Sequence, residues 1–193
     1  MATRGSIFVV SGPSGVGKHT ILRRLEERDP DLEHTVSATS RRPRRGEVPG
    51  KDYYFLDKDE FRRRVEAGDF VEWAEVHDSL YGTLREELER HVRSGKDVIL
   101  QLDVQGARNL KAALPQVTLV FIMPPSFEEL ERRIRRRASD DAEAVAVRLR
   151  NARAEMDARF EYDHVVVNET VETAVAECEA IIRRRRLAAA GQP

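Results

Sequence analysis

Nine residues near the start of the chain have the types and the spacing of a phosphate-binding loop. Residues 12–20 read GPSGVGKHT, in which two glycines separated by four residues are followed directly by Lys18. Glycine permits backbone angles that point successive N–H groups into one hollow, where an anion can bind. Lys18 would add a full positive charge for the outer phosphates of a nucleoside triphosphate. We therefore expect a triphosphate site formed by Gly12, Pro13, Ser14, Gly15, Val16, Gly17, Lys18, His19 and Thr20.

The position after Lys18 departs from the usual pattern of such loops. A Ser or Thr is expected there, because its hydroxyl helps to hold Mg²⁺. The chain has His19 at this position and Thr20 after it. Imidazole is a poor ligand for Mg²⁺, which prefers hard oxygen atoms. We expect His19 to be a surface residue at the start of a helix and Thr20 to supply the hydroxyl to the metal.

A second concentration of charge lies at residues 41–45, where four arginines flank Pro43. The guanidinium group can bind phosphate or carboxylate with two hydrogen bonds at once. A run of this kind is usually a solvated loop or a nucleic-acid-binding tail. In a chain that also has a phosphate loop, two of these side chains could instead close on one phosphate dianion.

The total charge argues against a protein that binds polyanions. Charged residues make up 35% of the 193 residues, yet the formal net charge is -1. A protein that coats nucleic acid or a membrane surface should be clearly basic. The chain has no run of about 18 apolar residues that could cross a bilayer and no secretory signal. Its one cysteine, Cys178, cannot form an internal disulfide. We expect a cytoplasmic protein that binds neither nucleic acid nor membrane.

Short apolar runs predict the elements that position these residues. The runs at 7–10, 98–100, 118–123 and 164–167 are rich in Val, Ile and Phe and do not alternate cleanly. Strands buried on both faces of a parallel sheet have this composition. Apolar residues at helical spacing lie between them. The pattern predicts an α/β fold with a P-loop-type parallel sheet flanked by helices.

Two stretches break the alternation. Residues 34–83 contain β-type runs and a turn-rich piece, which predicts a small, mostly β insertion. Residues 127–157 read as two strongly charged helices with little apolar surface, and a segment that buries little should be a mobile lid. The core then consists of residues 1–33, 84–126 and 158–193.

Several motifs, in this order, resemble those of the guanylate kinase family over residues 5–185. The residues at 37–55 (SATSRRPRRGEVPGKDYYF) and 70–83 (FVEWAEV, then YGT) are similar to that family's GMP-binding site. Residues 98–107 (VILQLDVQGA) resemble its central strand and 165–169 (VVVNE) a late core loop. The resemblance implies transfer of the γ-phosphoryl group of ATP to GMP, with dGMP as a second acceptor, in purine nucleotide metabolism.

The resemblance also implies which residues bind GMP. The phosphate would be bound by Arg41, Arg44, Tyr53 and Tyr81, and the base by Ser37, Glu72 and Thr83. One carboxylate can accept the adjacent N1–H and N2–H₂ donors of guanine, whereas the unprotonated N1 of adenine would repel it. The alternative for Glu72 is an outward-facing strand residue, although it shares a strand face with Phe70 and Ala74.

Two further acids have implied places in this site. Asp103 ends a hydrophobic strand, where an acid would contact GMP and orient Mg²⁺ through water. The family often has a second acid two positions earlier, but this chain has Gln101, which removes one negative charge. Glu47 matches another acidic position of the GMP lobe, and a simple turn residue is an equal alternative.

The resemblance assigns three arginines to the predicted lid. Arg133 and Arg137 are four residues apart and share one helix face, and Arg148 follows on the next helix. Together with Lys18 and Arg41 they would be the catalytic residues, since donors must meet the charge on the transferred phosphoryl group. Where the family often has Arg-Gly-Thr, residues 137–139 are Arg-Ala-Ser, which should stiffen the turn. Asn168 would lie near adenine or, alternatively, cap a turn.

Two other functions stay open at this point. One is a guanylate-kinase-like module that binds peptides and has lost catalysis, although such modules typically lack an intact phosphate loop and lid. The other is a related kinase with a different acceptor, which the complete guanine set argues against. The implied partners are the small molecules ATP and GMP with Mg²⁺ as cofactor, and the protein would be a monomer or a homodimer.

Overall fold

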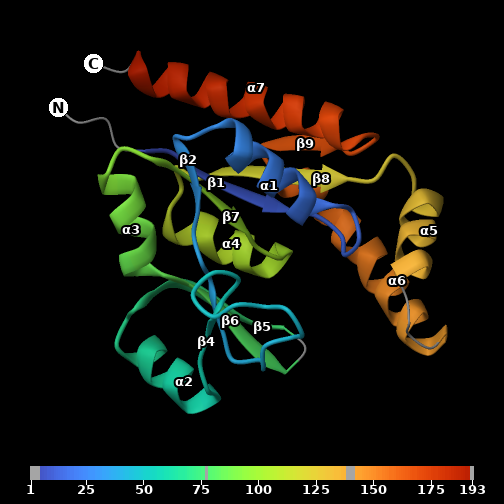
Figure 1. Ribbon diagram of the computed structural model, residues 1–193, viewed down its shortest axis with the longest axis horizontal. Helices are drawn as coiled ribbons and strands as arrows, with labels where there is room; N and C mark the ends of the chain where they lie inside the picture. The colour runs from blue at the N-terminus through green and yellow to red at the C-terminus, as the bar shows by residue number, and fades with distance from the viewer. Residues whose placement is uncertain (1–4, 77, 138–141, 192–193) are drawn as a thin grey trace.

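A five-stranded parallel sheet forms the centre of the molecule. The structure is a computed structural model and describes residues 5–76, 78–137 and 142–191. The strands lie in the order β2-β7-β1-β8-β9 and are all parallel (Figure 1). They are β1 (Ile7–Ser11), β2 (Leu32–His34), β7 (Asp97–Gln101), β8 (Thr118–Met123) and β9 (His164–Val167). Four of the five were predicted, and β2 was missed because three residues are too few to show a pattern.

Helices cover both faces of this sheet. Phe8 and Val10 of β1 pack with α1 (Lys18–Arg28) and α7 (Val171–Ala190), whereas its Ile7 and Val9 pack with α3 (Arg85–Arg93) and α4 (Val104–Ala113). Strand residues alternate between faces, so a strand covered on both sides needs apolar residues at every position. This confirms the α/β fold that the apolar runs predicted.

Strand β9 differs from its prediction as a strand buried on both faces. It lies at the edge of the sheet, and Val165 and Val167 are 45% and 41% exposed while Val166 is buried. At the edge of a sheet one face of a strand can lie beyond the helices that cover its neighbours. The apolar composition of β9 therefore does not show that both of its faces are buried.

A second sheet, in the order β4-β3-β6-β5, lies within residues 38–84, where the sequence predicted an insertion at 34–83. We call this part the inserted lobe; residue 34 instead belongs to β2 of the central sheet. Its elements are β3 (Ala38–Thr39), β4 (Tyr54–Phe55), α2 (Lys58–Glu66), β5 (Phe70–Val76) and β6 (Ser79–Leu84). Helix α2 was not predicted, and its Phe61 stacks on Phe70 with ring centroids 4.4 Å apart. A small separate core therefore holds the lobe together.

Helices α5 (Phe127–Arg137) and α6 (Ala142–Asp157) project from the sheet on a different side from the inserted lobe (Figure 1). The expectation that these helices bury little apolar surface is wrong. Leu130 and Ile134 of α5 and Val145 and Ala152 of α6 are buried in one cluster with Val16 of the phosphate loop. Each helix has a narrow apolar stripe, which its many charges obscure in the sequence. A short 3₁₀ helix, η1 (Ala158–Glu161), leads from α6 to β9.

No helix within the described ranges is both long enough and apolar enough to cross a membrane.

Candidate active site

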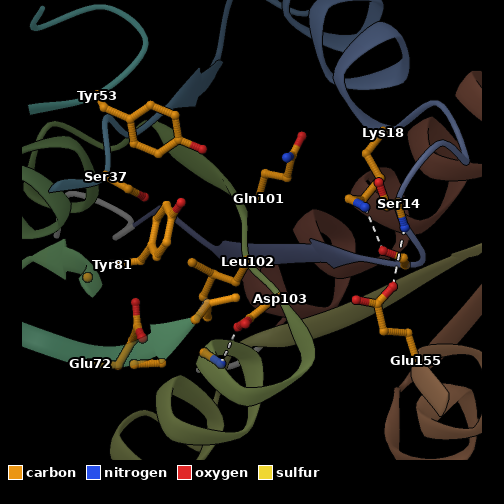
Figure 2. Close-up of a pocket in the computed structure, with 15 residues that line it drawn as sticks. Ser14, Lys18, Ser37, Tyr53, Glu72, Tyr81, Gln101, Leu102, Asp103 and Glu155 are labelled. Carbon is orange, nitrogen blue, oxygen red and sulfur yellow. Dashed lines mark hydrogen bonds between the residues drawn. The ribbon is translucent and has the colours of Figure 1, made fainter. Parts of the chain in front are cut away.

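A cavity lies at the carboxyl ends of β1 and β7, where ligands bind in open α/β sheets. The phosphate loop, the inserted lobe, the turn from β7 to α4, and α6 all contribute to it. Figure 2 shows Lys18, Ser14 and Glu155 along one side and the side chains of the lobe along the other. The polar and charged residues that line it are Ser14, Lys18, Ser37, Tyr53, Glu72, Tyr81, Gln101, Asp103 and Glu155.

The phosphate loop has the conformation that its glycines predicted. Gly12, Gly15 and Gly17 have φ angles of 147°, 85° and 104°, a region that other residues rarely adopt. A Cβ atom on Gly12 would lie 2.3 Å from the carbonyl oxygen of Ile122 in β8. The loop therefore packs against the sheet so closely that only glycine fits at its first position.

Lys18 is held inside this loop. Its Nζ donates hydrogen bonds to the carbonyl oxygens of Gly12, at 2.5 Å, and Pro13, at 3.1 Å. Burial lowers the pKa of Lys18 to about 8, and the negative charges of Glu155 and Asp103 act in the opposite direction. The charge of Lys18 therefore depends on its burial and on the two nearby carboxylates.

Asn168 supports the loop from the end of β9. It is buried, and its Nδ2 donates a 2.7 Å hydrogen bond to the carbonyl oxygen of Val16. A Cβ atom on Gly17 would lie 2.7 Å from the same Nδ2. Asn168 Oδ1 is buried and has no hydrogen-bond partner among the described residues. The amide nitrogen of Asn168 therefore holds the loop in place, and its amide oxygen takes no part in this contact.

Arg133 reaches the same place from α5. Its Nη1 lies 3.3 Å from the carbonyl oxygen of Val16 and its Nη2 lies 3.4 Å from that of Asn168, both as hydrogen bonds. Its Nε donates to Glu129 Oε1 at 2.7 Å. An arginine of the predicted lid thus lies directly on the phosphate loop.

Glu72 is a buried carboxylate on the opposite side of the cavity. Its residue is 5% exposed, and its Oε1 accepts a 2.7 Å hydrogen bond from the hydroxyl of Thr83, its partner on strand β6. Burial raises the pKa of Glu72 to about 7, the Thr83 hydrogen bond acts against this, and the charge of Asp103 adds to it. Ala74 on the same face is buried and Trp73 is 43% exposed, so the face expected from the alternation is correct.

Arg41 and Glu47 form a bidentate ion pair in the inserted lobe. Nη1 and Nη2 of Arg41 each lie 2.7 Å from one carboxylate oxygen of Glu47. Glu47 also accepts a 2.7 Å hydrogen bond from the backbone N–H of Arg44. The guanidinium carbon of Arg41 lies 5.0 Å from the centre of the Tyr53 ring, whose edge contacts Tyr81. Glu47 therefore holds Arg41 beside two tyrosines.

Comparison with known proteins identifies the family. Residues 4–185 match the family model described as guanylate kinase. A guanylate kinase of Shewanella sp. (strain MR-7) is 44% identical over 193 residues, covering 100% of this chain and 93% of that relative. One of Synechococcus sp. (strain CC9311) is 46% identical over 182 residues, covering 93% and 96%.

This chain belongs to the guanylate kinase family. The fold agrees, because a crystal structure of guanylate kinase from Anaplasma phagocytophilum matches with a TM-score of 0.78 and 37% identity. That match covers 94% of this chain and 86% of the other.

The residues that the guanylate kinase resemblance assigned do not all line the cavity. Thr83 lies behind Glu72, and Arg41, Arg44 and Glu47 form the adjoining turn of the lobe. Asp103 lines the cavity as the N-cap of α4 and accepts a 2.7 Å hydrogen bond from the N–H of Gly106.

Two of the remaining predicted residues, His19 and Arg148, are exposed on helices. His19 is exposed in the first turn of α1, next to Thr20, as expected for a surface residue at a helix start. Arg148 is exposed on α6. The side chain of Arg137 and the whole of Ala138 and Ser139 lie outside the described residues.

One charged residue of the cavity was not predicted. Glu155 lies within a charged helix whose sequence offers no motif, so only its position in the fold brings it to the phosphate loop. Gly106 was also missed, because nothing in the sequence indicates that a Cβ atom there would lie 3.3 Å from Glu72 Oε2.

Proposed function

We propose that this chain transfers the γ-phosphoryl group of ATP to GMP, giving ADP and GDP, and that it also accepts dGMP. One observation carries the proposal. The buried carboxylate of Glu72, which accepts a hydrogen bond from Thr83, lines the same cavity as Lys18 of the phosphate loop, so a guanine-selective group and a triphosphate-binding group share one space. Such a reaction recycles GMP within purine nucleotide metabolism.

Glu72 would select guanine. Its carboxylate can accept the N1–H and N2–H₂ donors together, and adenine offers no such pair. A matched bidentate contact of this kind discriminates between bases by about 1–3 kcal/mol. A buried carboxylate left without its donors adds a further penalty when the wrong base is bound. Thr83 and Ser37 would complete the base site.

The acceptor phosphate would bind where Arg41, Arg44, Tyr53 and Tyr81 come together. Arginine forks and phenolic hydroxyl groups donate hydrogen bonds to phosphate oxygens. Tyr53 and Tyr81 line the cavity, and Arg41 is already aligned by Glu47. These positions would direct an acceptor oxygen toward the phosphate loop.

The donor triphosphate would occupy residues 12–20, with Asn168 near its base. Lys18, Arg133, Arg137 and Arg148 would neutralise charge on the transferred group. The acceptor phosphate is already nucleophilic, so positioning and charge neutralisation are sufficient and no general base is required.

The residues present fit a magnesium ion that arrives with ATP. Such an ion takes one or two protein oxygens and completes its shell with phosphates and water. Thr20 offers a hydroxyl at the start of α1, and the Asp103 carboxylate is oriented into the cavity by the N–H of Gly106. When bound, the ion neutralises charge on the β- and γ-phosphates.

The proposal gives each part of the chain a task. Residues 34–83 would bind GMP, residues 127–157 would act as the lid, and the rest of the chain would form the nucleotide-binding core. The partners would be the small molecules ATP and GMP in the cytoplasm, without nucleic acid or membrane. Whether the protein is a monomer or a homodimer stays a prediction.

An assay of ADP formation from ATP tests the proposal, with GMP, dGMP, AMP, CMP and UMP as separate acceptors. We expect GMP and dGMP to be used and the other three to be poor acceptors. Glu72→Gln should sharply raise the KM for GMP and leave the KM for ATP unchanged. Glu75→Gln is the matched control, because Glu75 is exposed on the same strand. Equal turnover of GMP and AMP would overturn the guanine assignment, and no ADP at all would favour a binding module.

A further inference from the structure

Glu155 of α6 makes an unusual contact with the phosphate loop. Its Oε2 accepts a 3.2 Å hydrogen bond from the backbone N–H of Ser14, 141 residues away in the chain (Figure 2). The N–H groups of such a loop normally bind the oxygens of a phosphate. A carboxylate of the protein itself therefore binds one of the N–H groups of an anion site.

The charge of Glu155 also reaches the lysine of the loop. Glu155 and Lys18 line the same cavity. The negative charge of Glu155 raises the pKa of Lys18 against the larger effect of burial, which lowers it. Glu155 thus interacts with two of the groups on which a bound triphosphate depends, one N–H donor and one cation.

The position of Glu155 indicates which phosphate it would oppose. The cavity extends from Ser14 and Lys18 to Glu72 and Tyr81 of the inserted lobe, and Figure 2 shows Glu155 on its loop side. If a phosphoryl group passes from the phosphate loop to an acceptor bound in the lobe, the phosphate of ATP nearest the lobe is the γ-phosphate. ATP therefore places an anion beside Glu155, and ADP, which lacks the γ-phosphate, does not. Two anions at one place repel each other.

We propose that Glu155 is a positioning residue that binds the γ-phosphate end of the phosphate loop and is displaced by a triphosphate but not by a diphosphate. This inference rests on the proposed function only in that ATP is the donor. Arg148 lies seven residues before Glu155, so both are on the same face of α6. As part of the same proposal, displacement of Glu155 shifts α6, which carries one of the proposed lid arginines, and so couples γ-phosphate binding to the lid.

Binding of ADP and of the non-hydrolysable analogue AMP-PCP, measured by calorimetry without any acceptor, tests this proposal. We expect Glu155→Gln to lower the Kd for AMP-PCP about tenfold, because the nucleotide no longer has to break the charge-assisted contact between Glu155 and the Ser14 N–H. The Kd for ADP should change less than about twofold. The titrations of both proteins are run at the same pH and ionic strength. Glu143→Gln, an exposed position on the same helix, controls for the change in net charge. Because GMP is absent, a wrong acceptor assignment would not affect the result.

A second measurement uses the unmodified protein, in case the variant does not fold. The amide resonance of Ser14 should shift much further when AMP-PCP displaces Glu155 than when ADP binds. Equal loss or equal gain of affinity for the two nucleotides in Glu155→Gln would overturn the proposal. So would a Ser14 amide that shifts equally with both.

Discussion

The side chains of Thr83 and Glu72 meet across two neighbouring strands of the inserted lobe, with a 2.7 Å hydrogen bond from the hydroxyl to Oε1. The hydrogen bond involves only one oxygen of the Glu72 carboxylate, and the whole residue is buried. Burial raises the pKa of Glu72 to about 7. The group proposed to recognise guanine is therefore only partly charged at neutral pH in the free protein.

GMP binding should consequently depend on the charge of Glu72. Below pH 7 the carboxyl group gains a proton and can no longer accept two donors from guanine, so the KM for GMP should rise as the pH falls. The limiting slope is about tenfold per pH unit, as for one ionising group. The measurement is the KM for GMP between pH 5.5 and 8.5, with the KM for ATP determined alongside.

The phosphate of GMP also ionises near pH 6, so a matched protein is needed to separate the two effects. Glu72→Gln has no carboxyl group at this position and should retain only the dependence due to the phosphate. If the two proteins gave the same pH profile, Glu72 would not be the group that binds the base.

The ion pair between Arg41 and Glu47 leads to a second prediction. The Arg41 guanidinium lowers the pKa of Glu47 to about 2, so Glu47 is charged at every working pH. Glu47→Gln removes the charge that aligns Arg41 and should raise the KM for GMP about three- to tenfold, the effect of losing one charge-assisted contact. The value of kcat should change little.

Steady-state kinetics at saturating ATP measures this effect. Glu66→Gln, an exposed position on α2 of the same lobe, is the control and should behave as the unmodified protein. A lower KM in Glu47→Gln would mean that Glu47 competes with the phosphate for Arg41 and does not position it.

Gly106 allows a third prediction. A Cβ atom there would lie 3.1 Å from Asp103 Oδ1 and 3.3 Å from Glu72 Oε2, closer than side chains normally pack. Gly106→Ala should therefore displace the Glu72 carboxylate and raise the KM for GMP about fivefold, for a shift that costs about 1 kcal/mol. The same change improves helix propensity by about 1 kcal/mol, so the protein should be no less stable. Thermal unfolding and the KM values for both substrates check this. A large loss of stability, or an equal effect on ATP, would contradict it.

The features that could be predicted from sequence are those carried by neighbouring residues. Residues 12–20 contain the whole phosphate loop, and the alternation within β5 correctly placed Glu72 on the buried face. The parallel sheet was predicted from runs of apolar residues, because a strand covered on both faces requires them. Strand β9 shows the limit, since its composition does not indicate that it lies at an edge.

Contacts between distant segments could not be predicted. Asn168 donates to the loop carbonyl of Val16 across 152 residues, a contact that neither the family resemblance, which implied a place near adenine, nor the alternative of a turn cap had indicated. Glu155 reaches Ser14 in the same way. Neither position carries a local signal, because the partner is brought near only by the sheet order and the packing of α6. The expectation that α5 and α6 bury little apolar surface was wrong for the same reason, because the residues that pack against their narrow apolar stripes come from distant parts of the chain.

Arg186 illustrates a structural role that a run of four arginines conceals. Its Nη1 lies 2.8 Å from Asp29 Oδ2 at the end of α1, and its Nε lies 2.5 Å from Asp97 Oδ2 at the start of β7. The buried Asp97 also accepts a 2.6 Å hydrogen bond from the N–H of Ser6. One side chain of α7 therefore joins the end of α1 to the start of β7, far from the cavity.

Arg186→Ala should destabilise the protein without affecting catalysis. Removing one partner of a fully buried ion pair costs about 3–5 kcal/mol, but the Arg186 side chain is 36% exposed. We therefore expect the free energy of unfolding to fall by about 1–3 kcal/mol, in the range for an unsatisfied charged group. Urea unfolding measures this, and Arg183→Ala, an exposed position on the same helix, should change stability by less than about 0.5 kcal/mol. Equal stability of the two variants would show that Asp97 is satisfied without Arg186, and a changed KM for either substrate would contradict a purely structural role.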